Sequence, residues 1–199
     1  FAFESKEGLR RRVIGCKVRV EVEFSRKITV KKFEGDIGEL KNFIFASVFE
    51  NNQNISVYLL ENGFVSLQTP RVEEDVTKYF DALRDAEAKG KKDRKGINSG
   101  NESKPINFND LSGGKGKKID AGRCKNIFPF LKDEKTLTGV IDVVLNGSRF
   151  KVRFNQQSIL AIMVLEGVRC LPNEGAFAKA SEEALQYSKL HANQRDVEI

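Results

Sequence analysis

Two alternating runs of residues joined by an Asn-Gly pair constrain the fold of this chain more than any other feature. Residues 138–145 (TGVIDVVL) and 149–154 (RFKVRF) flank Asn146-Gly147. Alternation with a period of two predicts strands with one buried face, and Asn-Gly favours the type I′ turn that joins two antiparallel strands. Residues 159–165 add a third apolar run. The sequence therefore predicts a three-stranded antiparallel meander, followed by a helix over residues 174–192.

The first half of the chain predicts two strands and then two helices. Residues 17–24 (KVRVEVEF) alternate strictly between charged and apolar side chains, which predicts a strand whose valine face is buried. Residues 43–49 predict a second strand, and their phenylalanines have the spacing of core residues. Helices are expected over residues 55–62 and 76–89, with Gly63 and Gly90 as their C-terminal stops.

Residues 91–118 are rich in Gly, Ser, Asn and Lys, which is the composition of a linker. Residues 89–118 hold nine Lys/Arg and three Asp/Glu, and the remaining residues balance at 25 of each. Within that remainder, residues 1–32 are basic (ten against four) and residues 33–88 are acidic (four against eleven). This polarised distribution predicts a basic face that attracts a nucleic-acid backbone.

Several classes of protein are disfavoured. No apolar run approaches the roughly 20 residues that span a bilayer, and no apolar leader opens the chain, so we expect no membrane partner and a protein of the cytoplasm or nucleus. The three cysteines are Cys16, Cys124 and Cys170, without a CxxC pair, and the chain has one histidine. We therefore expect neither a disulfide framework nor a zinc site.

The two ends of the chain repeat one another. Residues 3–10 resemble residues 178–185 after a slide of one residue, so that Ser5 matches Ser181 and Glu7 matches Glu183. Farther along, Val20-Glu21-Val22 matches Val197-Glu198-Ile199. The two matched segments therefore lie at equivalent points of two successive structural repeats.

Read from the meander onward, the elements are three strands, a helix, two strands and two helices. Residues 1–22, 79–90, 127–131 (IFPFL), 147–151 (GSRFK) and 166–170 (EGVRC) resemble the Tudor staphylococcal nuclease family near the junction of its third and fourth repeats. The resemblance implies an α+β fold with OB-fold β-barrels of the staphylococcal-nuclease type, flanking helices and two incomplete repeats. Residues 1–90 would form the C-terminal part of one repeat, 91–122 a basic flexible linker, and 123–199 the N-terminal part of the next repeat.

In active members of this family, two aspartates hold calcium, two arginines clamp the phosphate and a glutamate acts as general base. Carried over to this sequence, the aspartates fall on Ser148 and Arg169 and the arginine of the third strand falls on Val164. The arginine of the first repeat falls on Glu61, and the glutamate falls near Asn173, beside Glu174. We therefore expect no catalytic residues and no cofactor in this chain, although active members use calcium.

The leading hypothesis is an RNA-binding scaffold with degenerate nuclease sites, which the resemblance connects with RNA processing, RNA silencing and transcriptional coactivation and with protein partners in those complexes. The alternatives are a calcium-dependent nuclease and a protein-interaction module that uses the acidic residues 33–88. The candidate RNA-contacting side chains lie on one predicted strand and near the N-terminus: Arg149, Lys151, Arg153, Arg10, Arg11, Arg12, Lys17 and Arg19.

Overall fold

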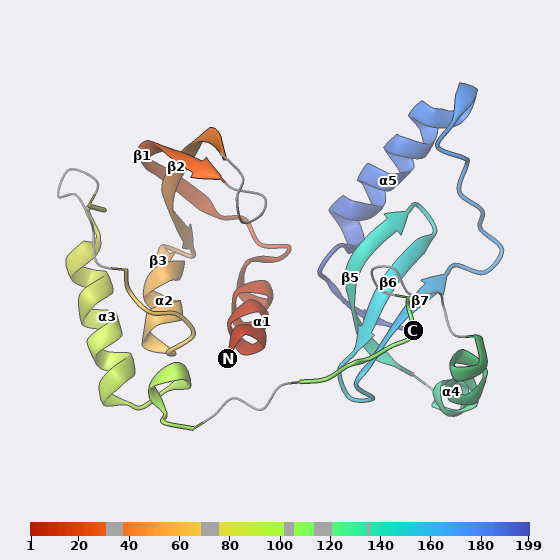
Figure 1. Cartoon of the computed structure of the whole chain (residues 1–199), viewed down its shortest axis with the longest axis horizontal. Helices are drawn as coiled ribbons and strands as arrows, with labels where there is room; N and C mark the ends of the chain where they lie inside the picture. The colour runs from red at the N-terminus through yellow and green to blue at the C-terminus, as the bar shows by residue number, and fades with distance from the viewer. Residues whose placement is uncertain (31–37, 69–75, 102–105, 114–120, 135) are drawn as a thin grey trace. The chain divides into compact units, whose positions relative to one another are not determined.

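The computed structural model describes residues 1–30, 38–68, 76–101, 106–113, 121–134 and 136–199 (Figure 1). The chain divides into two compact units, Phe1–Lys104 and Pro105–Ile199. Both units combine helices with a sheet, so the predicted α+β class is confirmed.

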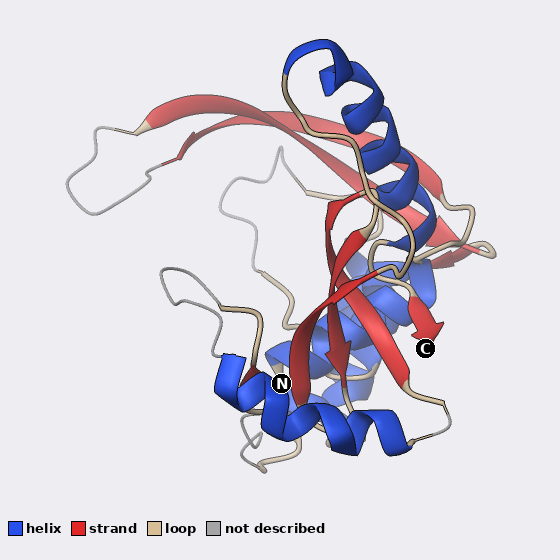
Figure 2. Ribbon diagram, turned by 90° about the vertical axis from the view of Figure 1, so that its right-hand side faces the viewer, coloured by secondary structure: helices blue, strands red, loops and turns tan. Residues whose placement is uncertain are grey.

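The first unit contains a long β-ribbon and its helices. In chain order the elements are α1 (Ala2–Val13), β1 (Arg19–Val30), β2 (Glu39–Glu50), β3 (Gln53–Asn54), α2 (Ile55–Glu61), α3 (Phe80–Lys92) and the 3-10 turn η2 (Gly96–Asn98). The sheet order is β1-β2-β3. Strands β1 and β2 pair antiparallel from Arg19 opposite Phe49 to Val30 opposite Glu39, with a bulge between Val22 and Phe24. Figure 2 shows this pair as a long twisted ribbon.

Helices α2 and α3 form the core of the first unit through Leu60, Leu83 and Ala86. Gly90 is buried inside α3, where an added Cβ would lie 2.4 Å from the Leu60 carbonyl oxygen. The prediction that Gly90 ends this helix is therefore wrong, because the glycine allows close approach of α2 and the helix continues to Lys92.

Strand β1 forms as predicted, but the prediction that its valine face is buried is wrong. Val18, Val20 and Val22 are 41%, 55% and 68% exposed. Strand pairing does not cover a face of the ribbon, and the described residues leave these side chains largely uncovered. Phe43, expected in the core, is likewise 40% exposed.

The second unit contains the predicted meander. Its elements are β4 (Asn109–Asp110), α4 (Ala121–Asp133), β5 (Thr138–Asn146), β6 (Arg149–Phe154), β7 (Ile159–Val164), η3 (Gly175–Phe177), α5 (Ala178–Ala192) and β8 (Asp196–Glu198). The pairs β5–β6 and β6–β7 are antiparallel, which confirms the meander. Asn146 lies opposite Arg149, so the turn residues are Gly147 and Ser148. Neither Asn146 nor Gly147 has the positive φ of a type I′ turn, so the predicted turn type is wrong. The sheet order is β4-β7-β6-β5-β8.

The core of the second unit lies on one face of this meander. Val152 and Phe154 are almost completely buried in this cluster, and Leu185 of α5 and Val197 of β8 pack against it. The described strands do not close into a barrel in either unit. The predicted OB-fold barrel is therefore not observed as a closed barrel, and the division into two incomplete repeats stays a prediction.

The range 91–122, expected to be a linker, contains the end of α3, η2, β4 and the start of α4 among its described residues. Its residues 102–105 and 114–120 lie outside the described part. Helix α4 was not predicted, because Pro129 interrupts its helical pattern; Phe128 and Phe130 are 62% and 75% exposed. Over the described residues, no helix combines the length and apolar character that crossing a membrane requires.

We predict that Phe154→Ala lowers the free energy of unfolding of the second unit by about 3–5 kcal/mol, because it opens a cavity in a close-packed core. Phe154 is 2% exposed, whereas Phe130 is 75% exposed. Phe130→Ala is therefore the control and should change stability by no more than about 0.5 kcal/mol. Urea unfolding followed by far-ultraviolet circular dichroism measures both, and equal losses would contradict the assigned core.

Candidate nucleic-acid interface

The turn between β5 and β6 is the centre of the candidate site in the second unit. The Asn146 side-chain oxygen accepts hydrogen bonds from the Ser148 N–H at 3.0 Å and from the Ser148 hydroxyl at 3.4 Å. The Ser148 carbonyl accepts a 3.0 Å bond from the Leu165 N–H, and Arg149 pairs opposite Val164. The end of β7 is therefore held against this turn.

The loop after β7 and helix α5 also meet the turn. An added Cβ on Gly147 would lie 3.0 Å from the Ala184 side chain and 3.1 Å from the Cys170 sulfur. The Ser188 hydroxyl donates a 3.3 Å bond to the Gly147 carbonyl. Ser148, Val164 and the segment that carries Arg169 therefore gather around one turn, as the resemblance implies for the catalytic positions.

These residues do not fit a calcium ion. Calcium requires six to eight oxygen ligands, mainly from carboxylates and carbonyls. Ser148 is 3% exposed and its hydroxyl bonds to its own turn, Val164 offers only methyl groups, and Arg169 is a cation. Across the part of the chain that the structure describes, no cluster of three His, Cys, Asp or Glu side chains could hold a metal. Glu166 and Glu174 are exposed in the same loop region.

In the first unit, the corresponding arginine position also departs from the family pattern. The Glu61 carboxylate accepts a 3.0 Å hydrogen bond from the Lys89 ammonium group. A carboxylate at this position repels a phosphate instead of binding it.

The three candidate side chains of β6 are not equally exposed. Arg149 is exposed and makes no ion pair within the described residues, and Lys151 Nζ lies 3.5 Å from Asp110 Oδ2. Arg153 is only 4% exposed, donates a 2.7 Å hydrogen bond to Asn155 and lies 5.6 Å from the centre of the Phe108 ring. The prediction that Arg153 is accessible is therefore wrong, because residues 106–113 cover this part of the strand.

Asp110 keeps its negative charge beside Lys151. Burial raises the pKa of this carboxyl group, but hydrogen bonds from the Ser112 hydroxyl and N–H and the charge of Lys151 outweigh that effect and lower its pKa. Lys151 therefore has an acidic partner at neutral pH.

The basic residues near the N-terminus differ in accessibility. Arg10 is 4% exposed and its Nε lies 3.0 Å from the Glu7 carboxylate, whereas Arg12 pairs with Glu50 at 3.2 Å and lies over the Tyr58 ring. Arg19 is about half exposed, pairs with Glu21 and lies 4.2 Å from the centre of the Phe49 ring. Arg11 and Lys17 are exposed, and neither makes an ion pair with another described residue.

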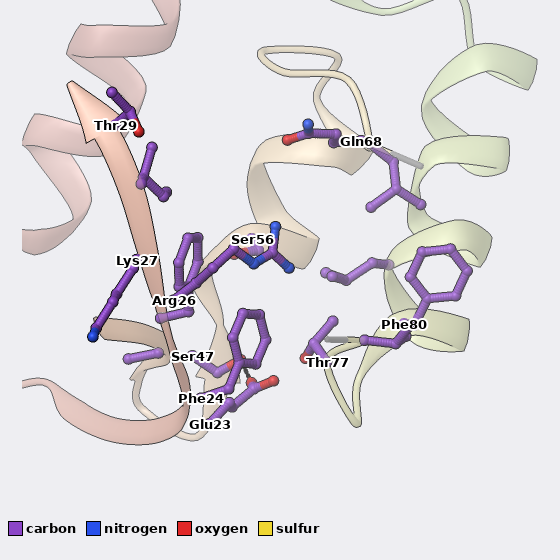
Figure 3. Close-up of a pocket in the computed structure, with 16 residues that line it drawn as sticks. Glu23, Phe24, Arg26, Lys27, Thr29, Ser47, Ser56, Gln68, Thr77 and Phe80 are labelled. Carbon is purple, nitrogen blue, oxygen red and sulfur yellow. Dashed lines mark hydrogen bonds between the residues drawn. The ribbon is translucent and has the colours of Figure 1, made fainter. Parts of the chain in front are cut away.

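A pocket in the first unit was missed from the sequence (Figure 3). It has a volume of about 710 Å³ and lies between the β1–β2 ribbon, the start of α2 and the start of α3. Phe24 and Phe45 stack with ring centres 4.8 Å apart, Arg26 lies 5.7 Å and 5.6 Å from them, and Glu23 accepts a hydrogen bond from Ser47. Alternation placed Phe45 in the core but could not show that this face opens onto a pocket.

No protein-family model matches this chain. It is 31% identical over 224 residues to Ribonuclease TUDOR 1 of Arabidopsis thaliana, covering the whole chain and 22% of that protein. Ribonuclease TUDOR 2 of the same organism is 31% identical over 215 residues, covering the whole chain and 21% of that protein. Staphylococcal nuclease domain-containing protein 1 of Schizosaccharomyces pombe is 22% identical over 170 residues, covering 85% of the chain and 18% of that protein. The chain spans about a fifth of the length of these curated relatives.

We predict that this chain does not cleave RNA or DNA in a calcium-dependent manner, because a serine, a valine and an arginine occupy the positions that the resemblance assigns to the metal and phosphate ligands. The measurement compares cleavage of labelled single strands in calcium and in chelator. Glu174→Gln is the control against contaminating nuclease. Cleavage that needs calcium and disappears in this variant would contradict the prediction.

Proposed function

We propose that this chain, a member of the Tudor staphylococcal nuclease family by its similarity over its whole length, is an RNA-binding scaffold that does not itself cut RNA. The observation that carries this proposal is the chemistry around the β5–β6 turn. Residues to which the resemblance assigns catalytic positions lie around this turn, and Arg169 provides a positive charge where the resemblance expects a calcium ligand. A cationic site favours a phosphate over a metal ion.

The docking surface that we propose consists of Arg149, Lys151 and Arg169. Arg149 and Arg169 are exposed, and Lys151 retains part of its surface beside Asp110. The chain as a whole has a net charge of +6, so long-range attraction of an anionic polymer acts in the same direction. Binding through phosphates carries little sequence information, and we therefore expect weak sequence preference.

We expect the chain to bind a single strand better than a duplex because the first unit, by itself, offers an aromatic and cationic pocket. Proteins that bind single strands combine basic grooves with aromatic rings that stack on bases. Phe24, Phe45 and Arg26 provide both kinds of group within one pocket. Arg11, Lys17 and Arg19 add basic groups to the first unit.

The wider role that we propose is in RNA processing, RNA silencing or transcriptional coactivation, with protein partners from those complexes, in the cytoplasm or the nucleus. The names of the two Arabidopsis relatives favour a nuclease as the second candidate. In that case the catalytic groups belong to other parts of such a protein, since the residues present here do not fit the metal.

We predict that RNA affinity falls steeply with salt, with a log-log slope of about 0.7 for each phosphate contact to a single strand, because bound cations are released. Arg149→Gln combined with Arg169→Gln should weaken binding about tenfold or more, because these side chains lie on an ordered turn and loop. Fluorescence anisotropy with a labelled single strand measures both effects.

The matched control is Lys115→Gln combined with Lys117→Gln, which removes the same charge from residues outside the described part. Its effect on affinity should be several-fold smaller than that of the turn variant. Equal losses in both variants would indicate diffuse attraction instead of a docking surface. Binding that ignores salt and both variants would remove RNA as the ligand and favour the protein-interaction module.

A further inference from the structure

Helix α2 ends in a turn that uses a glycine for its left-handed residue. The Gly63 N–H donates a 3.0 Å hydrogen bond to the Leu60 carbonyl, and the Phe64 N–H donates a 2.9 Å bond to the Leu59 carbonyl. This pair of bonds is the Schellman motif, which closes a helix with one residue in the left-handed conformation. Gly63 takes that position with a φ of +64°, and a glycine does so without steric cost.

Helix α3 ends in the same motif, but an arginine takes the glycine position. The Arg94 N–H donates a 3.2 Å bond to the Lys91 carbonyl, and the Lys95 N–H donates a 3.1 Å bond to the Gly90 carbonyl. Arg94 therefore corresponds to Gly63, and its φ is +50°. A Cβ is unfavourable in this conformation, and residues held in it cluster at sites where the side chain has a function. The Arg94 side chain is therefore a candidate for a function that glycine cannot serve.

The turn that carries Arg94 is fixed against the end of α2. The Ile97 N–H donates a 2.9 Å bond to the Gly63 carbonyl, and an added Cβ on Gly96 would collide with the same carbonyl. Gly90 allows the two helices to approach in the same way, and Figure 1 shows α2 and α3 side by side. The turn is therefore an ordered part of the first unit, so that its backbone has little entropy to lose when it binds a partner.

Arg94 and Lys92 carry the uncompensated charge of this turn. Both are exposed, and neither makes an ion pair with another described residue. Attraction to the negative end of the helix dipole accounts for lysines in the last turn of α3, but it does not require a side chain at position 94. The neighbouring lysines are each paired with a carboxylate: Lys89 with Glu61, Lys91 with Glu87 and Lys95 with Asp93, at 3.0, 2.8 and 3.4 Å.

We propose that Arg94 and Lys92 bind the phosphate backbone of single-stranded RNA, as a contact of the first unit that is separate from the β5–β6 turn. This inference rests on the proposed function, because RNA is its ligand. The planar guanidinium of Arg94 can bind two phosphate oxygens at once, and the Lys92 ammonium group adds a point charge. Backbone contacts carry no sequence information, so this turn contributes affinity and not sequence preference.

The experiment measures the affinity of the whole chain for labelled oligouridylate by fluorescence anisotropy over a range of salt concentrations. Arg94→Gly should weaken binding about fivefold at low salt and lower the log-log salt slope by about 0.7, which is the value for one phosphate contact to a single strand. Lys91→Gln is the matched control, since it removes the same charge from the same end of α3. Lys91 is already paired with Glu87, so the control should leave the affinity almost unchanged.

Hydrogen exchange read by mass spectrometry tests the strain at the same position. Amides of α3 should exchange more slowly in Arg94→Gly, because glycine relieves the left-handed residue and stabilises the end of the helix. A variant that is locally more stable but binds RNA less tightly separates a binding role of Arg94 from a structural one. Faster exchange in this variant would overturn the proposal, since Arg94 would then support the fold.

The remaining outcomes separate this inference from the proposed function. If the unaltered chain binds RNA with steep salt dependence and Arg94→Gly binds equally well, this inference alone is overturned. If the unaltered chain does not bind, or binds independently of salt, the proposed function and this inference both fall. An equal loss in Lys91→Gln indicates diffuse attraction and overturns the contact. Polyglutamate that competes as well as unlabelled RNA of equal charge would assign the turn to an acidic protein and overturn RNA as its ligand.

Discussion

The second unit depends on the lack of a side chain at Gly147. This residue lies in the turn that sets the β5–β6 register, and an added Cβ would meet Ala184 of α5 and Cys170 of the loop at about 3 Å. Contacts this short are tighter than nearly all those of real Cβ atoms, so a side chain at position 147 would require the helix or the loop to move by a few tenths of an ångström. The arrangement of Ser148, Arg149 and the Arg169 segment follows from that approach.

This arrangement does not depend on metal ligands. Backbone hydrogen bonds and close packing hold the turn, and neither needs an aspartate at position 148 or 169. Ser148 satisfies its own hydroxyl through Asn146 and is buried without a charge, which avoids the cost of burying an unpaired carboxylate. A serine at position 148 and an arginine at position 169 are therefore compatible with this fold, and the arginine makes the local charge positive.

The sequence predicted elements with strong local signals and failed where tertiary contacts decide. The meander, β1, β2 and α2 follow from alternation, Asn-Gly and helical spacing, and all were confirmed. Gly90 was mistaken for a stop because the close approach of α2 leaves no trace in local sequence. Alternation assigned the valine face of β1 correctly to one side but cannot tell whether another layer covers it. The burial of Arg153 was missed for the same reason, because residues 106–113, which cover it, lie about 40 positions earlier in the sequence.

Residues 106–113, which cover part of β6, also determine which cation contributes most to the proposed RNA binding. Asp110 has a lowered pKa, so it remains a carboxylate at neutral pH and neutralises part of the charge of Lys151; only as the pH falls through that lowered pKa does its protonation release the lysine. A phosphate at Lys151 must compete with this carboxylate and gains correspondingly less free energy. Arg149 has no acidic competitor among the described residues, and its planar guanidinium can bind two phosphate oxygens at once. The affinity of this face for an anion therefore depends chiefly on Arg149, and less on Lys151.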